Sequence, residues 1–161
     1  MILPAQATAM EQPGLSKENK IKATYLLHFT KYIHWPAAQS LVPVPLRLCL
    51  DTTVVFYDFM ADIITRYNAS GPHRLIQLEQ VVNAANCELT YLQNQVQPSL
   101  SQLSHSLLVV ESEAVGQPHS GITFYTLQRK IRFSINIDVL AGLNLSVSSE
   151  LLKLARIEHN A

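Results

Sequence analysis

The chain has 161 residues, of which 48% are hydrophobic and only 15% are charged, with 12 lysines and arginines against 12 aspartates and glutamates. This hydrophobic content lets a chain of ordinary domain length bury a core, which excludes an intrinsically disordered protein. The formal net charge of zero provides no electrostatic attraction to nucleic acid or to anionic lipid. No apolar run approaches the roughly 20 residues that a membrane-spanning helix needs, so we expect no direct membrane insertion.

The first 15 residues show no periodic pattern, so we expect them to form a flexible tail. Within this tail, Ala5-Gln-Ala7 has the small-x-small form of a signal-peptidase site and follows a short apolar stretch. We interpret the tail as the remnant of an export signal that is otherwise largely absent, with an Ala-rich cytosolic N-terminus as the alternative. The folded domain is expected over residues 16–161.

The first expected element is a helix over residues 17–34, with Ser16 as its N-cap. Apolar residues at intervals of four predict the face that packs against a sheet. This face consists of Ile21, Tyr25, Phe29 and Ile33. Several lysines, including Lys22, lie off the face. Pro36 disfavours helical geometry at Trp35, so the helix is expected to end there.

Strands and helices then alternate along the chain, which predicts a largely parallel sheet with helices on both faces. The expected strands cover residues 46–50, 74–78, 88–92 and 107–111, and the expected helices cover residues 54–67, 79–86 and 100–104. Two further alternating segments, 122–127 and 130–137, have the spacing of a β-hairpin. A short helical turn capped by Asp138, an edge strand over 143–147 and a last helix over 149–157 complete the chain.

These elements predict the α/β class. We expect a single three-layer domain, with a mixed, mostly parallel sheet flanked by helices and with a C-terminal β-hairpin and helix.

The sequence contains no recognisable catalytic motif. A nucleophile elbow, a phosphate-binding loop, a dinucleotide fingerprint and a zinc-binding helix are all absent from it. The expected strands end near Asp51, Gln77, Gln93 and Glu111, a sparse set of groups for catalysis at the carboxyl edge of a sheet. Glu111, Glu113 and His119 are spaced too loosely to favour a metal site over a solvated loop. We therefore expect no catalytic residues, no cofactor and no metal.

The two cysteines lie in segments that are expected to be core strands. Cys49 is near the end of one strand and Cys87 is at the start of another. An even number of cysteines in an exported protein suggests a disulfide bond. The alternative is a pair of buried, reduced cysteines that act as small hydrophobic residues, and the residues alone leave the choice open.

Three segments carry a resemblance to a known family. The first is an aromatic helix from Lys20 that ends at Trp35 and Pro36. The second is a strand with the sequence Arg-Phe-Ser-Ile-Asn-Ile-Asp at residues 132–138, and the third is Leu-Leu-Lys-Leu-Ala-Arg at residues 151–156. In their order and spacing, from Lys17 to Ile157, these segments resemble the YfiR family of periplasmic proteins, which hold a membrane diguanylate cyclase in check.

The resemblance implies a function and a disulfide. The chain would be a non-enzymatic periplasmic regulator and a homodimer. It would bind the periplasmic sensory domain of an inner-membrane diguanylate cyclase and repress it, and so control cyclic-di-GMP signalling and biofilm formation. Members of the family carry a disulfide at the positions of Cys49 and Cys87. The chain lacks their second cysteine pair, so redox sensing through a second bridge is not implied.

Two other functions remain open at this point. One is a periplasmic small-molecule binding module that acts on another membrane partner. The other is a small enzyme with an unusual site, which would need a pocket with several perturbed titratable groups.

The C-terminal segment is the expected partner or dimer interface. Leu151, Leu152 and Leu154 cover more of a helix than one core face requires, so part of this set is available for docking. Arg156 would border the patch with positive charge. Trp35 is a further interface residue, because tryptophan is a common anchor of protein interfaces. The alternatives are that all three leucines are buried and that Trp35 seals one end of the sheet.

Overall fold

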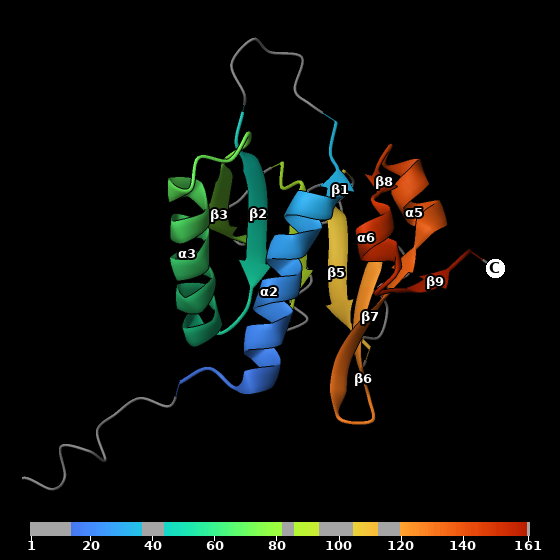
Figure 1. Cartoon of the computed structure of the whole chain (residues 1–161), viewed down its shortest axis with the longest axis horizontal. Helices are drawn as coiled ribbons and strands as arrows, with labels where there is room; N and C mark the ends of the chain where they lie inside the picture. Colours follow the sequence, from blue (N-terminus) through green and yellow to red (C-terminus); the bar gives the residue numbers. More distant parts are fainter. Residues whose placement is uncertain (1–13, 37–43, 82–85, 94–104, 113–119, 161) are drawn as a thin grey trace, which may run out of the picture.

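The computed structural model describes residues 14–36, 44–81, 86–93, 105–112 and 120–160. Within them, one mixed sheet has seven strands (Figure 1). The strands are β2 Leu46–Asp51, β3 Ile76–Gln80, β4 Leu89–Leu92, β5 Leu107–Glu111, β6 Ile122–Leu127, β7 Lys130–Asn136 and β9 Arg156–Glu158. Their order across the sheet is β3-β2-β4-β5-β6-β7-β9. The predicted α/β class is therefore confirmed.

The sheet is parallel from β3 to β6. β6 and β7 form an antiparallel hairpin, and β9 runs parallel to β7 at the end of the sheet. The chain starts the sheet at β2, adds β3 on one side and then continues with β4, β5 and β6 on the other side. The direction of winding therefore reverses between β2 and β4, the kind of position at which open α/β sheets commonly bind ligands.

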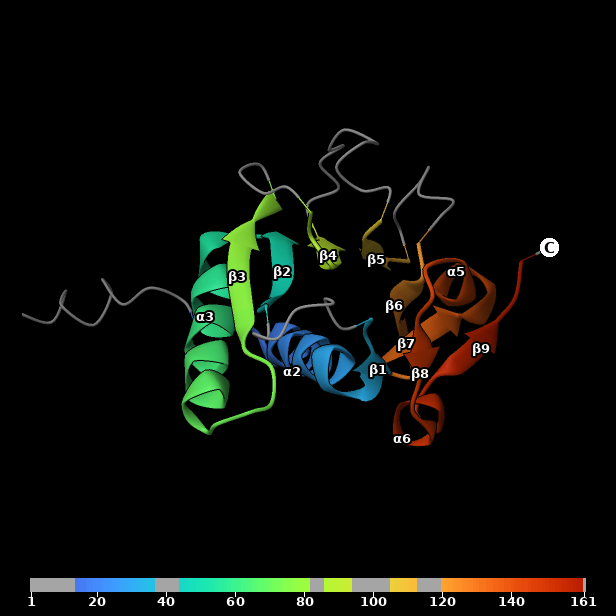
Figure 2. The same ribbon diagram turned by 90° about the horizontal axis from the view of Figure 1, so that it is seen from above.

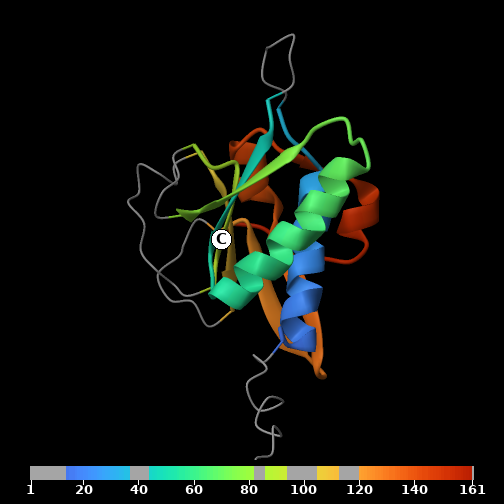
Figure 3. The ribbon, with the colours of Figure 1, turned by 90° about the vertical axis from the view of Figure 1, so that its left-hand side faces the viewer.

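Two long helices lie on the same face of the sheet (Figures 2 and 3). They are α2, Lys17–Tyr32, and α3, Val54–Ala69. α2 begins at the predicted cap Ser16 and α3 begins at Thr53, and each of these side chains accepts a backbone N–H. Between these helices and the sheet lies the main core, which contains residues from β2, β4, β5, β6 and β7.

The buried face of α2 differs from the predicted one. Phe29 is fully buried, but the other fully buried positions of the helix are Ala23 and Leu26, whereas Ile21 and Tyr25 are only partly buried. The Phe29 ring lies 5.0 Å from the Phe133 ring on β7. α2 is therefore rotated relative to the prediction, because it packs against α3 on one side as well as against the sheet below it.

The β6–β7 hairpin is confirmed, and its turn has an unusual sequence. Gln128 and Arg129 have φ values of 52° and 65°. Positive φ at both central residues is the requirement of a type I′ turn, which usually contains Asn-Gly. The twist of the two strands therefore imposes the turn on residues that do not favour it.

The C-terminal region differs most from the predictions. Asn136, not Asp138, caps the short helix α5, Ile137–Gly142, since the Asn136 side chain accepts the backbone N–H of Asp138. β8, Ser146–Val147, does not extend the large sheet but pairs with β1, Ile33–His34, immediately after α2. The last helix, α6, is confined to Ser149–Leu152.

The helix predicted over 149–157 is therefore wrong beyond residue 152. The chain turns after α6 and continues as β9, because the free edge of β7 offers parallel pairing to Arg156, Ile157 and Glu158. The strand predicted over 74–78 lies instead over 76–80, so Glu79 and Gln80 are not helical. The rest of the predicted 79–86 helix lies mostly, and the predicted 100–104 helix entirely, outside the described residues.

Candidate functional site

The disulfide lies on the face of the sheet opposite α2. Cys49 in β2 is bonded to Cys87 before β4, with the two Cα atoms 5.9 Å apart. Cys49 is 0% exposed and Cys87 is 5% exposed. They belong to a second hydrophobic cluster, which also contains Val81, Leu92, Leu108 and Val110. The bond implied by the family resemblance is therefore present, and it is protected from solvent.

Two ion pairs surround the disulfide. Arg47 on β2 contacts Glu79 on β3 with an N–O distance of 2.9 Å, and Arg74 contacts Glu88 at the same distance. Glu88 directly follows Cys87, and its carboxylate also accepts the backbone N–H of Arg47, which links this segment to β2. The partly exposed Arg74–Glu88 pair ties the segment around Cys87 to the residues just before β3, and the Arg47–Glu79 pair ties β2 to β3.

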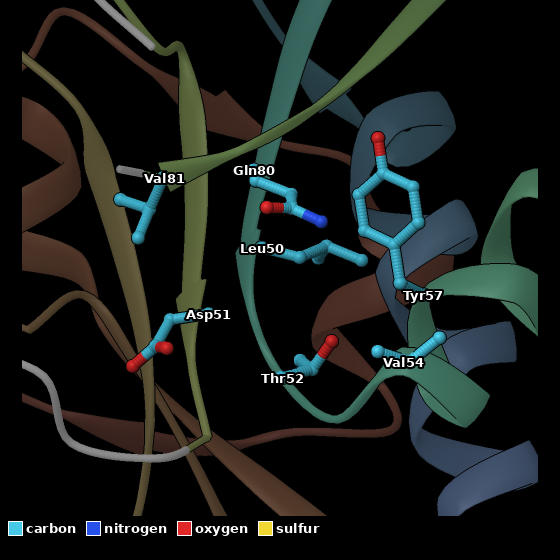
Figure 4. A pocket seen from close by; sticks show the side chains of 7 residues that line it. All are labelled: Leu50, Asp51, Thr52, Val54, Tyr57, Gln80 and Val81. Carbon is cyan, nitrogen blue, oxygen red and sulfur yellow. The ribbon is translucent and has the colours of Figure 1, made fainter. Parts of the chain in front are cut away.

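A pocket of about 200 Å³ lies at the carboxyl ends of β2 and β3 (Figure 4). The side chains of Gln80 and Thr52 face this space from the strand ends, and Tyr57 faces it from α3, whereas the Asp51 carboxylate points away. The Tyr57 hydroxyl donates to the carbonyl oxygen of Leu78. Burial raises the pKa of Tyr57, and the charges of Glu79 and Asp58 raise it further.

The pocket offers neutral polar groups and apolar walls. Amide, hydroxyl and aliphatic side chains of this kind suit a small uncharged polar molecule. Gln77, which the sequence placed at a strand end, instead lies near the start of β3, and Gln80 occupies the end. Prediction missed Gln80 because the strand is shifted by two residues toward the C-terminus.

A cluster of titratable groups joins α2 to the ends of two central strands. Lys22 on α2 forms an ion pair with Glu111 at the end of β5, and both side chains are only 14% exposed. The hydroxyl of Tyr91 on β4 donates to the other Glu111 oxygen at 3.0 Å. Burial raises the pKa of Tyr91 well above its ordinary value, and the negative charge of Glu111 raises it further.

This cluster is arranged as an anchor. Both carboxylate oxygens of Glu111 are occupied by protein donors, and Tyr91 is held neutral. Beside it, the Gln93 amide donates to Asn19, so a second side chain at a strand end contacts α2. The sequence places Glu111 and Gln93 correctly at strand ends, but Lys22 was missed because its charge suggested a solvent-facing position.

His28 lies on α2 between two tyrosine rings. Its ring is perpendicular to those of Tyr25 and Tyr32, at centroid distances of 6.3 and 5.8 Å. Burial lowers the pKa of the imidazole from its ordinary value of 6.5, and the positive charge of Lys31 lowers it further. The neutral form of His28 is therefore favoured in the folded protein.

The predicted interface residues separate into buried and exposed positions. Leu151 is 1% exposed and belongs to the main core, so it is not available at the surface of the chain. Leu152 is partly exposed, and Leu154, in the turn after α6, is 54% exposed. Arg156 lies on β9 rather than on a helix. The surface left for a partner is thus Leu152, Leu154 and Arg156, which we call the C-terminal patch.

Trp35 lies just after β1 and packs against the main core, partly buried. Its indole Nε1 is buried and has no acceptor among the described residues. A buried donor without an acceptor is costly, but an atom with no exposed surface offers nothing to a partner in this conformation. Trp35 stays a prediction as a contact residue through the exposed part of its ring, separate from the C-terminal patch.

The described residues show neither a metal-binding group nor a membrane-spanning helix. Among the described residues, no group of three or more histidines, cysteines, aspartates and glutamates could hold a metal ion. Glu111 of the loosely spaced acidic set is bound to Lys22, and Glu113 and His119 lie outside the described residues. In the same part of the chain, no helix is both long and apolar enough to span a bilayer.

Comparison with known proteins identifies the family. A family model described as YfiR/HmsC-like matches residues 19–156, which is most of the chain. No curated protein matches the sequence. The matched range includes α2 from Asn19 onward, both cysteines and the large sheet as far as the first residue of β9. The chain therefore belongs to the YfiR/HmsC-like family, in agreement with the resemblance described above.

Proposed function

We propose that this YfiR/HmsC-like protein is a non-enzymatic periplasmic regulator that binds an inner-membrane diguanylate cyclase and represses it. Binding to the external sensory domain would stabilise the inactive state of the cyclase and so lower cytoplasmic cyclic-di-GMP and biofilm formation. A regulator of this kind acts through a difference in affinity between two states of its target. Family membership over residues 19–156 is the observation that carries the proposal.

The disulfide supports the periplasmic part of this proposal. Disulfides form and persist in oxidising compartments such as the bacterial periplasm and are rare in the cytosol. Cys49 and Cys87 are buried on one face of the sheet, where the bond reinforces a structural cluster. Export by a signal peptide and action as a homodimer are further parts of the proposal.

We propose the C-terminal patch and Trp35 as contact surfaces. Leu154 is a large exposed apolar side chain close to the charged Arg156, a combination common at protein interfaces. The partly exposed Trp35 ring adds an aromatic side chain of a type common at interfaces. Both features suit a protein partner better than they suit a small metabolite.

The test compares cyclic-di-GMP in cells that lack the gene with cells that express the wild-type protein from a plasmid. Loss of the gene should raise cytoplasmic cyclic-di-GMP, and the wild-type copy should restore the low level. Affinity capture from the membrane fraction should recover a protein with a periplasmic sensory domain and a cyclase domain. Unchanged cyclic-di-GMP together with capture of a different membrane protein would overturn the proposal.

A small-molecule binding function is a second candidate because of the pocket in Figure 4. In this case a ligand held by Gln80, Thr52 and Tyr57 would determine the output to another membrane partner. Gln80→Ala and Tyr57→Phe test this function, because they alter the pocket lining while leaving the C-terminal patch intact. If both variants respond like the wild type to periplasmic extract, the pocket is not the sensing site.

A further inference from the structure

β9 forms one edge of the seven-stranded sheet (Figures 1 and 2). β7 pairs with it on one side, with Ser134 opposite Arg156 and Ile135 opposite Ile157. No strand of the described residues pairs with the other side. An edge strand presents backbone N–H and C=O groups that can pair with a strand of another chain.

The side chains of β9 carry charges of opposite sign on either side of an apolar residue. Arg156 and Glu158 are joined by an ion pair of 2.9 Å, and their side chains are 57% and 43% exposed. Ile157 between them is 40% exposed. The Arg156 guanidinium also lies 4.3 Å from the centre of the Tyr125 ring on β6. Tyr125 and Glu158 thus hold this arginine in place, which lowers the entropy cost of using it in an interface.

We propose that β9 pairs with β9 of a second copy of this chain, antiparallel, across a twofold axis at Ile157. In this register Arg156 lies opposite the partner's Glu158, and Glu158 lies opposite the partner's Arg156. The two Ile157 side chains face each other on the axis. The proposal rests on the homodimer that is part of the proposed function, and it assigns a surface to that dimer.

The pattern of charges selects this arrangement. Directly opposite residues in a strand pair stabilise it when their charges differ and destabilise it when the charges are alike. Parallel pairing in register would place Arg156 opposite the partner's Arg156. Natural edge strands that avoid association commonly carry charges that repel a second copy, whereas the order Arg-Ile-Glu is complementary to itself in the antiparallel direction.

The other edge of the sheet lacks this complementarity. An antiparallel pair of two β3 strands centred on Leu78 would place Gln77 opposite the partner's Glu79. Gln77 is neutral, so the charge of Glu79 would face no opposite charge. The charges of the two edges therefore favour association through β9.

The contact must extend beyond three residues, because stable interfaces bury about 800 Å² on each partner. Leu154 is 54% exposed and lies two residues before the strand. It provides apolar surface next to the paired edges. The dimer surface would thus include part of the C-terminal patch, and Arg156 and Glu158 of β9 would each face an opposite charge across the axis.

Two charge-reversal variants test the proposal when they are measured alone and mixed. In Arg156→Glu, both charged positions of β9 are negative, and in Glu158→Arg both are positive. Each variant alone faces a like-charged copy, so its dimer dissociation constant should rise about tenfold or more. When the two variants are mixed, every cross-axis pair is again opposite in charge, and a heterodimer should form. Analytical ultracentrifugation measures all three samples together with the wild type.

Each variant lacks the Arg156–Glu158 ion pair within its own chain, and mixing does not restore that pair. A heterodimer in the mixture would therefore report charge pairing between the two chains. Gln77→Glu on β3 is the matched control and should leave dimerisation unchanged. As an independent measurement, Ile157→Cys should form a disulfide-linked dimer under mild oxidation, while Leu127→Cys at the exposed hairpin should not.

The outcomes separate the surface from the proposed function. A wild-type dimer that survives both charge reversals, or a mixture that stays monomeric, overturns pairing through β9. A wild-type protein that is monomeric at all concentrations overturns both this surface and the homodimer. Repression of the cyclase is measured separately in cells, so a repressing monomer would leave the regulatory function standing.

Discussion

At the scale of single residues, His28 links stability to pH in a predictable direction. Its pKa is lowered by burial and by Lys31, so the unfolded state binds more protons than the folded state just below the ordinary value of 6.5. The contribution of His28 to the free energy of unfolding is therefore fully present above pH 6.5 and is lost as the pH falls through the lowered pKa.

We predict that His28→Gln reduces the acid sensitivity of the protein. The decrease in the free energy of unfolding between pH 7.5 and pH 5.5 should be smaller than in the wild type, because the residue that takes up the extra proton on unfolding is gone. Urea denaturation at several pH values gives the measurement. His73→Gln, in the turn before β3, is the control for loss of a histidine at a surface position. Equal slopes for His28→Gln and the wild type would contradict the prediction.

The disulfide supplies a second prediction at this scale. Cys49 and Cys87 close a loop with a sequence separation of 38 residues. In the chain-entropy model such a bond contributes about 4 kcal/mol by restricting the unfolded state. The double variant Cys49→Ala/Cys87→Ala should lose about 2–5 kcal/mol in chemical denaturation, and the unreduced, unfolded wild type should show no free thiol. Two free thiols in the wild type would contradict the bond and weaken the argument for a periplasmic location.

At the scale of the elements, α2 is held by both apolar and charged contacts. Phe29 is fully buried among the rings of Phe124 and Phe133. At the other end of the helix, Lys22 is paired with Glu111. The helix therefore has one buried face and a fixed position along the sheet.

We predict that Phe29→Ala lowers the free energy of unfolding by about 3–5 kcal/mol, because it removes a fully buried ring and leaves a cavity. Thermal and urea denaturation give the value. Leu127→Ala, at a side chain that is 51% exposed, should change stability by less than about 0.5 kcal/mol. A loss below about 1 kcal/mol for Phe29→Ala would mean that α2 is not docked on the sheet in solution.

At the β6–β7 turn, a substitution is expected to raise the stability of the protein rather than lower it. Arg129 has a φ of 65°, a conformation that costs a non-glycine residue roughly 1–2 kcal/mol. Arg129→Gly relieves this cost, partly offset by the greater freedom of glycine in the unfolded chain. The variant should be more stable by up to about 1 kcal/mol. A less stable variant would show that the Arg129 side chain makes a contact that outweighs the backbone strain.

The sequence predicts some elements better than others for physical reasons. β2, β5 and the hairpin have local apolar patterns, so their positions are predicted closely. β9 is missed because its three residues contain one apolar side chain between two charges, and only the free edge of β7 makes them a strand. The same limit applies to the site: Lys22 has a charge that suggests exposure, and its pairing with Glu111 depends on contacts between distant segments.

At the scale of the whole molecule, the described features divide the protein into regions with different roles. The disulfide, its ion pairs and the Figure 4 pocket lie toward the β2 and β3 side of the sheet. The C-terminal patch and the open edge of β9 lie at the opposite end (Figure 1). A partner bound at β9 would therefore leave the disulfide cluster undisturbed, so stability and recognition can be altered separately by mutation.

Leu154→Glu tests this separation. Leu154 is 54% exposed, so a carboxylate at this position remains in water and the variant should fold with a melting temperature near that of the wild type once the dimer equilibrium is taken into account. It should lose dimerisation, cyclase repression or both, because the charge is placed in an apolar contact. Light scattering reports the dimer, and cytoplasmic cyclic-di-GMP reports repression.

Two matched substitutions make the result specific to the patch. Leu151→Glu, at a side chain that is 1% exposed, should instead unfold the protein, because it buries a charge in the main core. Leu127→Glu, at a leucine of similar exposure on the hairpin, should be neutral in both assays. If Leu154→Glu stays a fully repressing dimer, the C-terminal patch is not a contact surface and the partner must bind elsewhere, with Trp35 as the next position to test.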